Sequence, residues 1–544
     1  MPEEASQLDY ETLRAEFTWR IPTSFNMARA ASTAHRRDRL ALVSVSEDGS
    51  VDNTTYGELD RLSNRLANVL GGLGVGRGDR VGVVIPQSLE TGLAHLAIWK
   101  LGAVSLPLAA LFGPDALGYR ISDSGSKLVV TTPENVEKVR EAAPEIPVLV
   151  TGDQLDALVS AASDDLPEVA TNAEDPAYLI YTSGTTGPPK GALHAHRSLF
   201  GHLPGFECYY EFADRAPEGR SDLATLPGVA SDLDWHDVIW TPADWAWIGG
   251  LMDVLMPAWF YGMTVVTADR DFDPDWAADL MAEHGVTLSF LPPTALKMMR
   301  AAGVSRADDL SLRAVFSGGE PLGEEILAWA DEHLGVRINE GYGQTECNLV
   351  VGNCGSVLAV RPGSMGRAVP GHEVQVQDEE GRRLVGEVGE ICVLRPDPVM
   401  MLEYWERPDA TAEKYRGEWL LTGDLGVEDE DGYLWFKSRK DDVISSMGYR
   451  IGPGEIEASL MGHPDVAMCA VVGVPDEIRG QVPAAFVVTR PGVVPDDHLV
   501  DELQQHVRIR LAAHEVPRRI AFVEDLPRTT TGKIMRRALR PEGV

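Results

Sequence analysis

Patterns typical of helices and of strands alternate along the first part of this chain. Residues 56–70 carry apolar side chains at helical spacing, and the glycines between 71 and 78 end this pattern. Residues 80–85 then form an apolar run, which is typical of a buried strand. Similar runs recur at residues 128–131, 287–291 and 314–316. This alternation predicts an α/β fold with largely parallel sheets.

The sequence pattern changes near residue 367, where short strand patterns and turns replace the longer alternation of helix and strand patterns. Asp431 and Gly432 are typical of a tight hairpin turn within this part. Two further strand patterns and a helical run follow, at residues 466–474, 484–488 and 496–513. These elements are enough for a small α+β domain. We therefore expect one domain over residues 1–440 and a second over residues 441–544.

Composition limits the classes of partner. The chain has 544 residues, of which 44% are hydrophobic and 24% are charged, close to an average soluble globular protein of two or three domains. Its formal net charge is −35, because 83 acidic residues outnumber 48 basic ones. A negative field of this size repels nucleic acids and anionic membranes. We expect neither kind of partner, so local basic side chains must attract any anionic ligand.

Cysteine usage and the N-terminal segment bear on where the protein resides. The five cysteines lack the CxxC spacing of metal clusters and disulfide frameworks. The acidic N-terminus lacks the basic and then apolar order of a signal peptide. The most apolar long stretch, residues 251–266, is interrupted by Asp253, Pro257 and Gly262 and is too short to span a bilayer. We expect a cytoplasmic protein without membrane insertion, either a monomer or a homo-oligomer.

A loop rich in glycine and hydroxyl side chains joins two strand patterns at residues 181–191, with the sequence Tyr-Thr-Ser-Gly-Thr-Thr-Gly-Pro-Pro-Lys-Gly. Glycines let backbone N–H groups approach phosphate oxygens, and the hydroxyls and Lys190 add donors and positive charge. A Walker loop places its lysine directly after a glycine and before a helix, whereas two prolines separate Gly187 from Lys190 here. The pattern predicts a polyphosphate-binding loop of another kind rather than a flexible surface turn.

This loop resembles the phosphate-binding motif of the adenylate-forming superfamily, which comprises acyl-CoA synthetases, peptide-synthetase adenylation domains and luciferases. Six further matches follow in the family's order: Ser317-Gly-Gly-Glu-Pro321, Gly341-Tyr-Gly-Gln-Thr-Glu346, Trp419-Leu-Leu-Thr-Gly-Asp424, Ser438-Arg-Lys-Asp-Asp442, residues 446–457 and Pro527-Arg-Thr-Thr-Thr-Gly-Lys533. Seven motifs in register leave chance a negligible explanation. Within the superfamily the chain is similar to AMP-forming acyl-CoA synthetases of the acetyl and medium-chain type.

The resemblance implies a fold and a reaction. The fold is a large N-terminal domain of parallel-sheet αβ subdomains with a small β-barrel-like part, followed by a small mobile α+β domain. The reaction joins a carboxylic acid to ATP, forming an acyl-adenylate and pyrophosphate, and then transfers the acyl group to the thiol of CoA. The implied ligands are therefore a small-molecule carboxylic acid, ATP, Mg²⁺ and CoA.

The resemblance also implies the roles of single residues toward ATP. Lys533 bridges the substrate carboxylate and the α-phosphate, Thr345 contacts the α-phosphate and Glu346 holds Mg²⁺. Asp424 accepts both ribose hydroxyls, and Arg439 donates to the ribose. The remaining ATP-binding residues are Thr182, Ser183, Gly184, Thr185, Thr186, Gly187, Lys190, Gly319, Glu320, Pro321, Gly341, Tyr342, Gly343 and Gln344. A lysine in a basic C-terminal tail is usually a solvated residue, but the glycine turn before Lys533 favours a presented side chain.

The second half-reaction requires the small domain to rotate about a hinge, and Asp441 occupies the hinge position of the family. Rotation withdraws Lys533 and brings three residues to the thiol tunnel: Gly448, Tyr449 and Arg450. Arg479 matches a CoA-contacting arginine of medium-chain synthetases, but it fits a turn arginine paired with Asp476 or Glu477 equally well.

The acyl pocket is the part that the sequence leaves most open. Acetyl-CoA synthetases carry tryptophan where this chain has Gly343, so acetate is not the expected substrate, and tryptophan at this position is expected to shift preference toward acetate. Residues 241–250 resemble the acyl-pocket helix, with Trp245, Trp247 and Gly249 as candidate walls or as simple packing residues. No aspartate stands out as an amino-group anchor. We expect a short- to medium-chain aliphatic acid, with a benzoate-type aryl-CoA ligase and a stand-alone adenylation enzyme that loads a carrier protein as alternatives.

Overall fold

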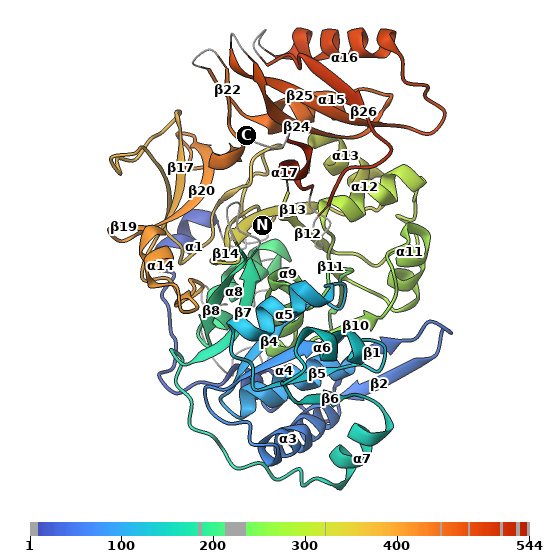
Figure 1. The fold of residues 1–544 in the computed structure, drawn as a ribbon, viewed down its shortest axis with the longest axis vertical. Helices are drawn as coiled ribbons and strands as arrows, with labels where there is room; N and C mark the ends of the chain where they lie inside the picture. The colour runs from blue at the N-terminus through green and yellow to red at the C-terminus, as the bar shows by residue number, and fades with distance from the viewer. Residues whose placement is uncertain are drawn as a thin grey trace, which may run out of the picture.

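The computed structural model describes residues 9–182, 188–212, 236–320, 322–446, 449–476, 479–511, 515–528 and 534–540. Two large mixed sheets and an antiparallel sheet form the body of the molecule, and a smaller sheet with its helices lies at one end (Figure 1). The α/β fold predicted from the sequence is confirmed, including the separate antiparallel part and the small α+β C-terminal unit. Within the described residues, no helix combines the length and the apolar character needed to cross a membrane.

A seven-stranded sheet contains the two strands that flank the glycine-rich loop. Its order is β18 (Glu403–Tyr404), β8 (Lys190–Ala195), β7 (Pro176–Thr182), β4 (Val104–Pro107), β3 (Arg80–Val84), β5 (Leu128–Thr131) and β6 (Val148–Val150). The strands from β7 to β6 are parallel, while β8 and β18 are antiparallel. The two strands predicted on either side of the glycine-rich loop are thus confirmed.

A nine-stranded sheet carries the motif of residues 341–346. Its order is β15 (Arg367–Ala368), β14 (Cys347–Gly352), β13 (Ile338–Gln344), β12 (Ala314–Gly318), β11 (Leu288–Phe290), β9 (Val238–Trp240), β10 (Thr264–Ala268), β1 (Leu40–Val45) and β2 (Val51–Thr55). The strands from β13 to β1 are parallel, and the edges β2, β14 and β15 are antiparallel.

The largest hydrophobic core packs helices against both of these sheets. It includes residues of α2 (Met27–Ser32), α3 (Tyr56–Gly72), α4 (Leu89–Lys100), α8 (Ser198–Tyr209), η3 (Leu251–Leu255) and α10 (Met256–Phe260). α3 begins where the sequence predicts, because Thr55 and Glu58 form a reciprocal capping box. α4 is buried on nearly every face, which explains its apolar character all round.

Other helices cover the outer faces of the two sheets. α11 (Pro274–Glu283), α12 (Pro293–Ala302) and α13 (Glu324–His333) pack on the nine-stranded sheet, and α5 (Pro114–Asp123) and α6 (Val136–Ala142) pack on the seven-stranded one. The remaining helices of this part are α1 (Tyr10–Glu16), α7 (Asp153–Ala161), α9 (Ile248–Gly250) and α14 (Pro408–Glu413). β12 and β13 lie below the C-terminal unit in the view of Figure 1.

Two smaller sheets complete the fold. The antiparallel sheet is ordered β16 (Val374–Gln377), β17 (Val388–Leu394), β20 (Trp419–Glu428) and β19 (Tyr415–Arg416), and β21 (Leu434–Arg439) pairs with β20 across the predicted hairpin turn. After η4 (Lys440–Asp442), the last sheet is ordered β23 (Tyr449–Ile451), β22 (Ile444–Ser446), β25 (Gly480–Thr489) and β24 (Val466–Asp476), with β26 (Arg519–Phe522) on β25. α15 (Pro453–Met461) and α16 (Asp497–Arg510) pack on this sheet, and α17 (Arg536–Leu539) ends the described chain.

Candidate active site

Asp424 lies where the nine-stranded sheet meets the antiparallel sheet. Its Oδ2 accepts hydrogen bonds from the Tyr342 hydroxyl at 2.7 Å and from Gln344 Nε2 at 2.5 Å. Both donors come from the end of β13, whereas Asp424 belongs to β20. β13 also carries Gly341 and Gly343, and Thr345 follows in the turn before β14. Two motifs that the resemblance assigns to the nucleotide therefore meet in space.

Arg439 stands opposite Asp424 in the β20–β21 ladder. Its Nε lies 3.0 Å from Asp424 Oδ1, and Asp424 is only 3% exposed. Burial raises the pKa of Asp424, and the Arg439 guanidinium opposes this shift. A carboxylate oriented by two donors and one cation is a preorganised acceptor, which suits a pair of sugar hydroxyls.

Glu346 is a buried carboxylate just after the same strand, and it is 8% exposed. The Tyr404 hydroxyl donates to its Oε1 at 2.5 Å, while its Oε2 accepts no hydrogen bond from any described residue. Mg²⁺ prefers one or two carboxylates together with phosphate oxygens. One oriented and one available oxygen fit such an ion. Sequence reasoning missed Tyr404, because it belongs to none of the seven motifs.

The hairpin of β7 and β8 brings Lys190 opposite Thr182. Lys190 Nζ lies 5.4 Å from the centre of the Tyr404 ring, so this lysine is close to the partner of Glu346. Five residues predicted to bind phosphate lie outside the described residues: Ser183, Gly184, Thr185, Thr186 and Gly187. Their contacts stay predictions.

The turn expected at the adenine pocket follows β12. Gly319 has a φ of +92°, a conformation that favours glycine, and Glu320 comes next, while Pro321 lies outside the described residues. Ser317 pairs with Glu340 in the β12–β13 ladder. Burial raises the pKa of Glu340 to about 7. Sequence reasoning missed this carboxyl, although it directly precedes the motif of residues 341–346.

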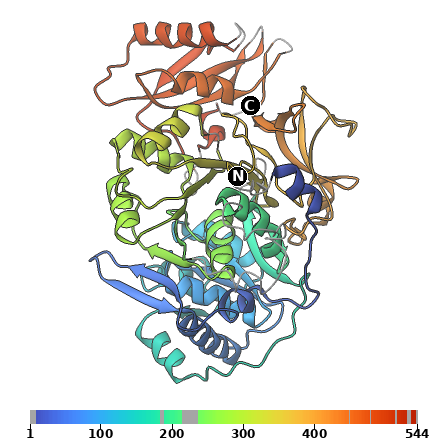
Figure 2. The same ribbon diagram turned by 180° about the vertical axis from the view of Figure 1, so that it is seen from behind.

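Lys533 lies outside the described residues, but the segments on both sides of it are described. Arg528 and Ile534 form an antiparallel bridge, and Met535 N donates to the Pro527 carbonyl at 2.7 Å. α17 follows and lies between the C-terminal sheet and the nine-stranded sheet in both views (Figures 1 and 2). The described residues on either side of Lys533 are therefore held together, and the contacts of Lys533 itself stay predictions.

Arg536, at the start of α17, connects this segment with its surroundings. Its Nε and Nη2 donate to the two carboxylate oxygens of Glu457, at 2.9 and 2.6 Å. Burial lowers the pKa of Arg536, but the charges of Glu457, Asp442 and Glu320 raise it overall. The electrostatic interaction between Arg536 and Glu320 connects the C-terminal unit with the turn expected at the adenine pocket.

The residues assigned to the hinge and to CoA lie in η4 and in the C-terminal sheet. Asp441 is exposed, and Arg540 Nη2 donates to its carbonyl at 3.1 Å. The Arg479 N–H donates to Asp476 Oδ1 at 2.8 Å, which is a turn contact. The others are Tyr449 and Arg450 in β23, and Gly448, which lies outside the described residues. Contacts of these residues with CoA stay predictions.

The segment expected to form the acyl-pocket helix becomes helical only from Ile248. Trp245 is fully buried and packs edge-on against Trp259 with ring centres 6.4 Å apart, as a core residue does. Trp247 lies just before the helix and contacts Phe112 edge-on at 5.6 Å. The roles of these tryptophans as pocket walls stay predictions.

Gly343 faces the backbone of β14. A Cβ atom on Gly343 would lie 2.4 Å from the Leu349 nitrogen and 2.7 Å from Asn348 Cα. No side chain fits there unless the β13–β14 hairpin moves. A tryptophan at this position would therefore have to displace the β13–β14 hairpin, and the expected shift of preference toward acetate stays a prediction.

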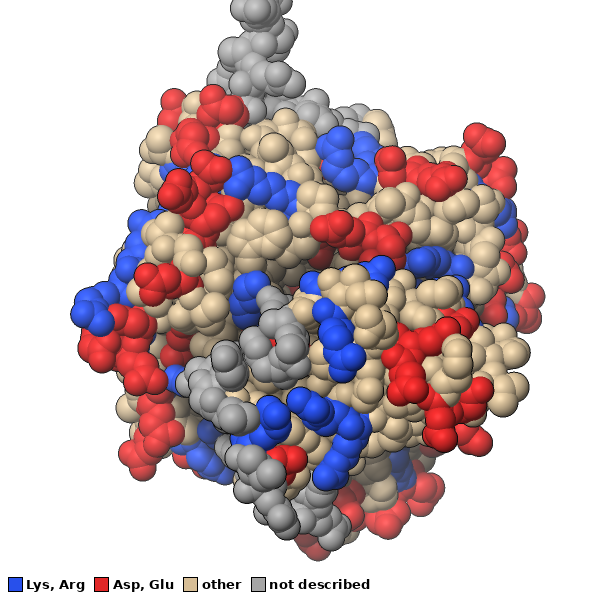
Figure 3. Space-filling view, turned by 90° about the horizontal axis from the view of Figure 1, so that it is seen from above, with Lys and Arg blue, Asp and Glu red and all other residues tan. Residues whose placement is uncertain are grey.

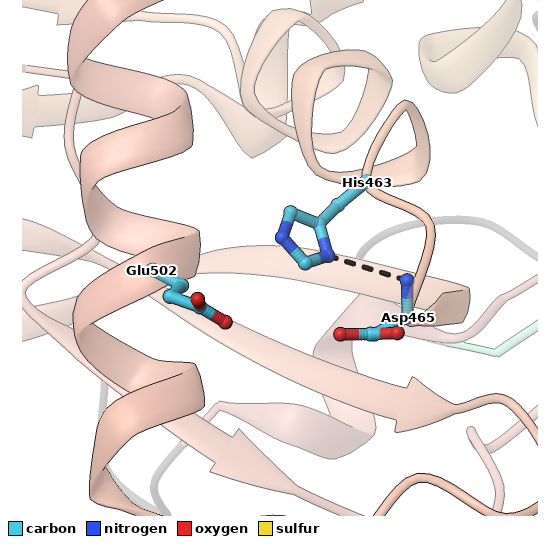
Figure 4. Close-up of side chains that lie close together, drawn as sticks. All are labelled: His463, Asp465 and Glu502. Atoms are coloured by element: carbon cyan, nitrogen blue, oxygen red, sulfur yellow. Dashed lines mark hydrogen bonds between the residues drawn. The ribbon is translucent and has the colours of Figure 1, made fainter.

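One group of possible metal ligands lies elsewhere, on the C-terminal unit: His463, Asp465 and Glu502 (Figure 4). The Asp465 N–H donates to His463 Nδ1 at 3.3 Å, which occupies one ring nitrogen. The His463 ring also packs against His506 at 5.1 Å. These contacts explain the positions of His463 and Asp465 as ordinary contacts within the protein.

Family comparisons agree with the fold. The AMP-binding enzyme family matches residues 28–405, and the AMP-binding enzyme C-terminal domain matches residues 455–533. The chain belongs to the AMP-binding enzyme family, in the adenylate-forming superfamily, and is an acyl-CoA synthetase. Enzymes of this group use ATP, Mg²⁺ and CoA. The resemblance found in the sequence is confirmed.

Several relatives show the range of this group. The chain is 34% identical to YtcI of Bacillus subtilis, an uncharacterized acyl–CoA ligase, over 92% of this chain and 93% of the relative. It is 35% identical to the human mitochondrial acyl-coenzyme A synthetase ACSM4, over 96% and 91%. The solved benzoate CoA ligase of Burkholderia xenovorans matches with a TM-score of 0.82 and 29% identity, over 95% and 100%.

Proposed function

We propose that this protein is an AMP-forming acyl-CoA synthetase for short- to medium-chain carboxylic acids, straight or branched. The acid reacts with ATP to an acyl-adenylate and pyrophosphate, and the thiol of CoA then displaces AMP. The observation that carries the proposal is the convergence of Tyr342, Gln344 and Arg439 on the buried Asp424 carboxylate, next to Glu346.

In the first half-reaction a carboxylate oxygen attacks the α-phosphorus and pyrophosphate leaves. Both reactants are anionic, so catalysis depends on positioning and on neutralising charge. Asp424 holds the ribose hydroxyls, while Lys190 and Lys533 supply positive charge. When bound at Glu346, Mg²⁺ neutralises phosphate charge. Basic side chains gather in the lower middle of the face seen in Figure 3, so the negative field is not uniform over this face.

In the second half-reaction the domain of residues 441–544 turns about Asp441 relative to residues 1–440. Arg540 supports motion as one body, because its Nη2 donates to Asp442 Oδ1 at 2.7 Å and thus ties α17 to the hinge. Turning withdraws Lys533 from the nucleotide. It presents Tyr449 and Arg450 to CoA.

Chain-length preference in a hydrophobic pocket is shallow. Each buried methylene contributes about 0.8 kcal/mol, which is only a few-fold in specificity. We therefore propose a spread of accepted acids. An aryl-CoA ligase is the second candidate, because Phe290 stacks on Phe316 at 4.9 Å beside Gly249 and offers an aromatic surface.

The decisive experiment measures AMP release with ATP, Mg²⁺ and acids from acetate to decanoate, with isobutyrate and benzoate, each with and without CoA. The proposal expects CoA-dependent turnover with a maximum between propionate and octanoate. A maximum at benzoate would establish the aryl alternative. Pyrophosphate exchange without CoA-dependent turnover would point to a carrier-protein acceptor and would contradict the proposal.

A further inference from the structure

Asp253 is a buried carboxyl that none of the seven motifs contains. It lies in the middle of η3, a π-helical turn between α9 and α10, and is 5% exposed. Its Oδ1 accepts a hydrogen bond from Asn348 Nδ2 at 2.6 Å. Its Oδ2 has no hydrogen-bond partner among the described residues. π-Helical turns inside α-helices occur frequently at functional sites.

The surroundings of Asp253 do not compensate a negative charge. Among the described residues, no lysine or arginine pairs with it. Burial raises its pKa well above the usual range, and the Asn348 hydrogen bond opposes this only in part. The Oδ2 atom of Asp253 is therefore available to accept a hydrogen bond from a ligand.

Asp253 is next to Gly249, and its partner Asn348 is next to Gly343, two glycines predicted to line the acyl pocket. Its Oδ2 lies 3.7 Å from the position that a Cβ on Gly249 would take. Its partner Asn348 touches Gly343, because a Cβ there would lie 2.7 Å from Asn348 Oδ1. The Phe290 ring edge lies 3.0 Å from the same Gly249 position, so an apolar surface borders the carboxyl.

The Asp253–Asn348 pair is also close to the expected site of chemistry. Asn348 follows Glu346 by two residues in the chain, and Gly343 lies between Tyr342 and Gln344, which both donate to Asp424. We infer that a substrate whose carboxylate is activated at this hairpin extends its acyl part toward η3, where Gly249 is a predicted pocket residue. The polar end of Asp253 is then within reach of a substituent on that acyl part.

We propose that Asp253, oriented by Asn348, forms a hydrogen bond to a hydroxyl or amino substituent on the acyl part of the substrate acid. The preferred substrates are therefore substituted acids rather than plain alkyl or aryl acids. This inference rests on the proposed function and narrows its substrate class. The burial of Asp253 beside Gly249 is a feature that only the fold reveals.

The competing explanation is structural. Asn348 Nδ2 lies 3.5 Å from His202 Nε2 as well as 2.6 Å from Asp253, so the three side chains link α8, η3 and β14. A purely structural link predicts that changing Asp253 affects all acids alike. An anchor predicts that the effect depends on the substituent.

The test compares matched acids: butyrate with 3-hydroxybutyrate and 3-aminobutyrate, and benzoate with its 2-hydroxy and 2-amino derivatives. Each is assayed for CoA-dependent AMP release by the full-length wild type, Asp253→Leu and Asp253→Asn. Glu207→Gln serves as the matched control, because Glu207 is a buried carboxyl outside the acyl-pocket segment and accepts from the Tyr261 hydroxyl.

We expect the wild type to prefer a substituted acid over its plain partner by at least about 10-fold in kcat/KM, as loss of a hydrogen bond to a buried group typically costs. Asp253→Leu should abolish this preference, mainly by raising KM for the substituted acid. Asp253→Asn should retain the preference for hydroxy-substituted acids. It should lose the preference for amino-substituted acids if their amino group is cationic. Glu207→Gln should leave the ratios unchanged.

Two results would overturn the inference alone. One is a wild type that turns over plain acids as well as substituted ones, and the other is an Asp253→Leu variant that lowers kcat/KM for every acid by the same factor. If Asp253→Leu does not fold, the wild-type ratios and Asp253→Asn decide. Absence of CoA-dependent turnover with every acid, plain or substituted, would instead refute the proposed function.

Discussion

The Tyr342 hydroxyl donates a 2.7 Å hydrogen bond to Asp424 Oδ2 across 82 residues of chain and from one sheet to another. This contact, with that of Gln344, fixes the carboxylate before any ligand arrives. Preorganised acceptors of this kind lose little when they bind, because no rearrangement is needed.

Replacing Asp424 with asparagine should weaken ATP use strongly. The asparagine side chain keeps the shape of aspartate but loses the negative charge of the carboxylate that accepts hydrogen bonds from the two ribose hydroxyls. Hydrogen bonds to charged groups contribute about 1.5–3 kcal/mol each. We expect kcat/KM for ATP to fall by about 10- to 100-fold, measured by pyrophosphate exchange. Tyr342→Phe, which removes only a supporting donor, should cost less. Equal losses in the two variants would contradict the assigned roles.

Lys533→Ala should separate the two half-reactions. Loss of a preorganised charge contact typically costs on the order of 10²-fold or more in rate, and we expect this loss in adenylation. Conversion of supplied acyl-adenylate and CoA to thioester should persist, because the proposed rotation has withdrawn Lys533 by then. A similar loss in both half-reactions would refute the two-conformation mechanism.

Arg536→Met should impair adenylation because it displaces α17, and not because Arg536 takes part in the reaction. Arg536 holds α17 on Glu457 with two hydrogen bonds, and small displacements of a reacting group cost up to about 10²-fold. We expect the free energy of unfolding to fall by about 1–2 kcal/mol, as for a partly exposed pair. Arg537→Met is the matched control, because the neighbouring Arg537 lies on the exposed side of the same helix. Similar effects of both substitutions would show that Arg536 has no special role.

Gly343→Ala should destabilise the protein without improving acetate use. The added methyl group meets the backbone of β14 at 2.4 Å, and overpacking of this kind costs roughly 1–3 kcal/mol. Chemical denaturation measures the loss, and the acid profile should keep its shape. A stable variant with enhanced acetate turnover would show that the hairpin adapts.

Stability should depend on pH through Glu207. Burial raises the pKa of Glu207 from 4.5 to about 8, and the Tyr261 hydroxyl donates to it. Because the folded protein then binds more protons than the unfolded chain, this contribution is fully present below pH 4.5 and is lost as pH rises toward 8. Relative to Glu207→Gln, the wild type should lose about 1.4 kcal/mol per pH unit within this window. Parallel curves for the two proteins would contradict the shift.

Much of the fold was predictable from local pattern. Apolar runs at residues 80–85 and 128–131 became parallel strands, and the apolar face of residues 56–70 became α3 with a capping box at its start. The seven motifs also indicated which residues meet the nucleotide. These features are encoded locally, because periodicity and turn chemistry act over a few residues.

The sequence by itself therefore determined the strands, the helices, the family and the reaction class of this protein. Tertiary structure alone decided that Tyr404 orients Glu346, that β14 closes the space beside Gly343, and that Asp253 is buried next to Asn348. The physical reason is that burial and pairing depend on contacts between residues far apart in the chain. Tyr404 and Glu346 are 58 positions apart, and Asn348 and Asp253 are 95 apart, so the local sequence around each residue does not identify its partner. In the sequence, an aspartate within an apolar segment gives the same pattern whether its side chain faces water or a pocket. Only the packing of the folded chain distinguishes these two environments.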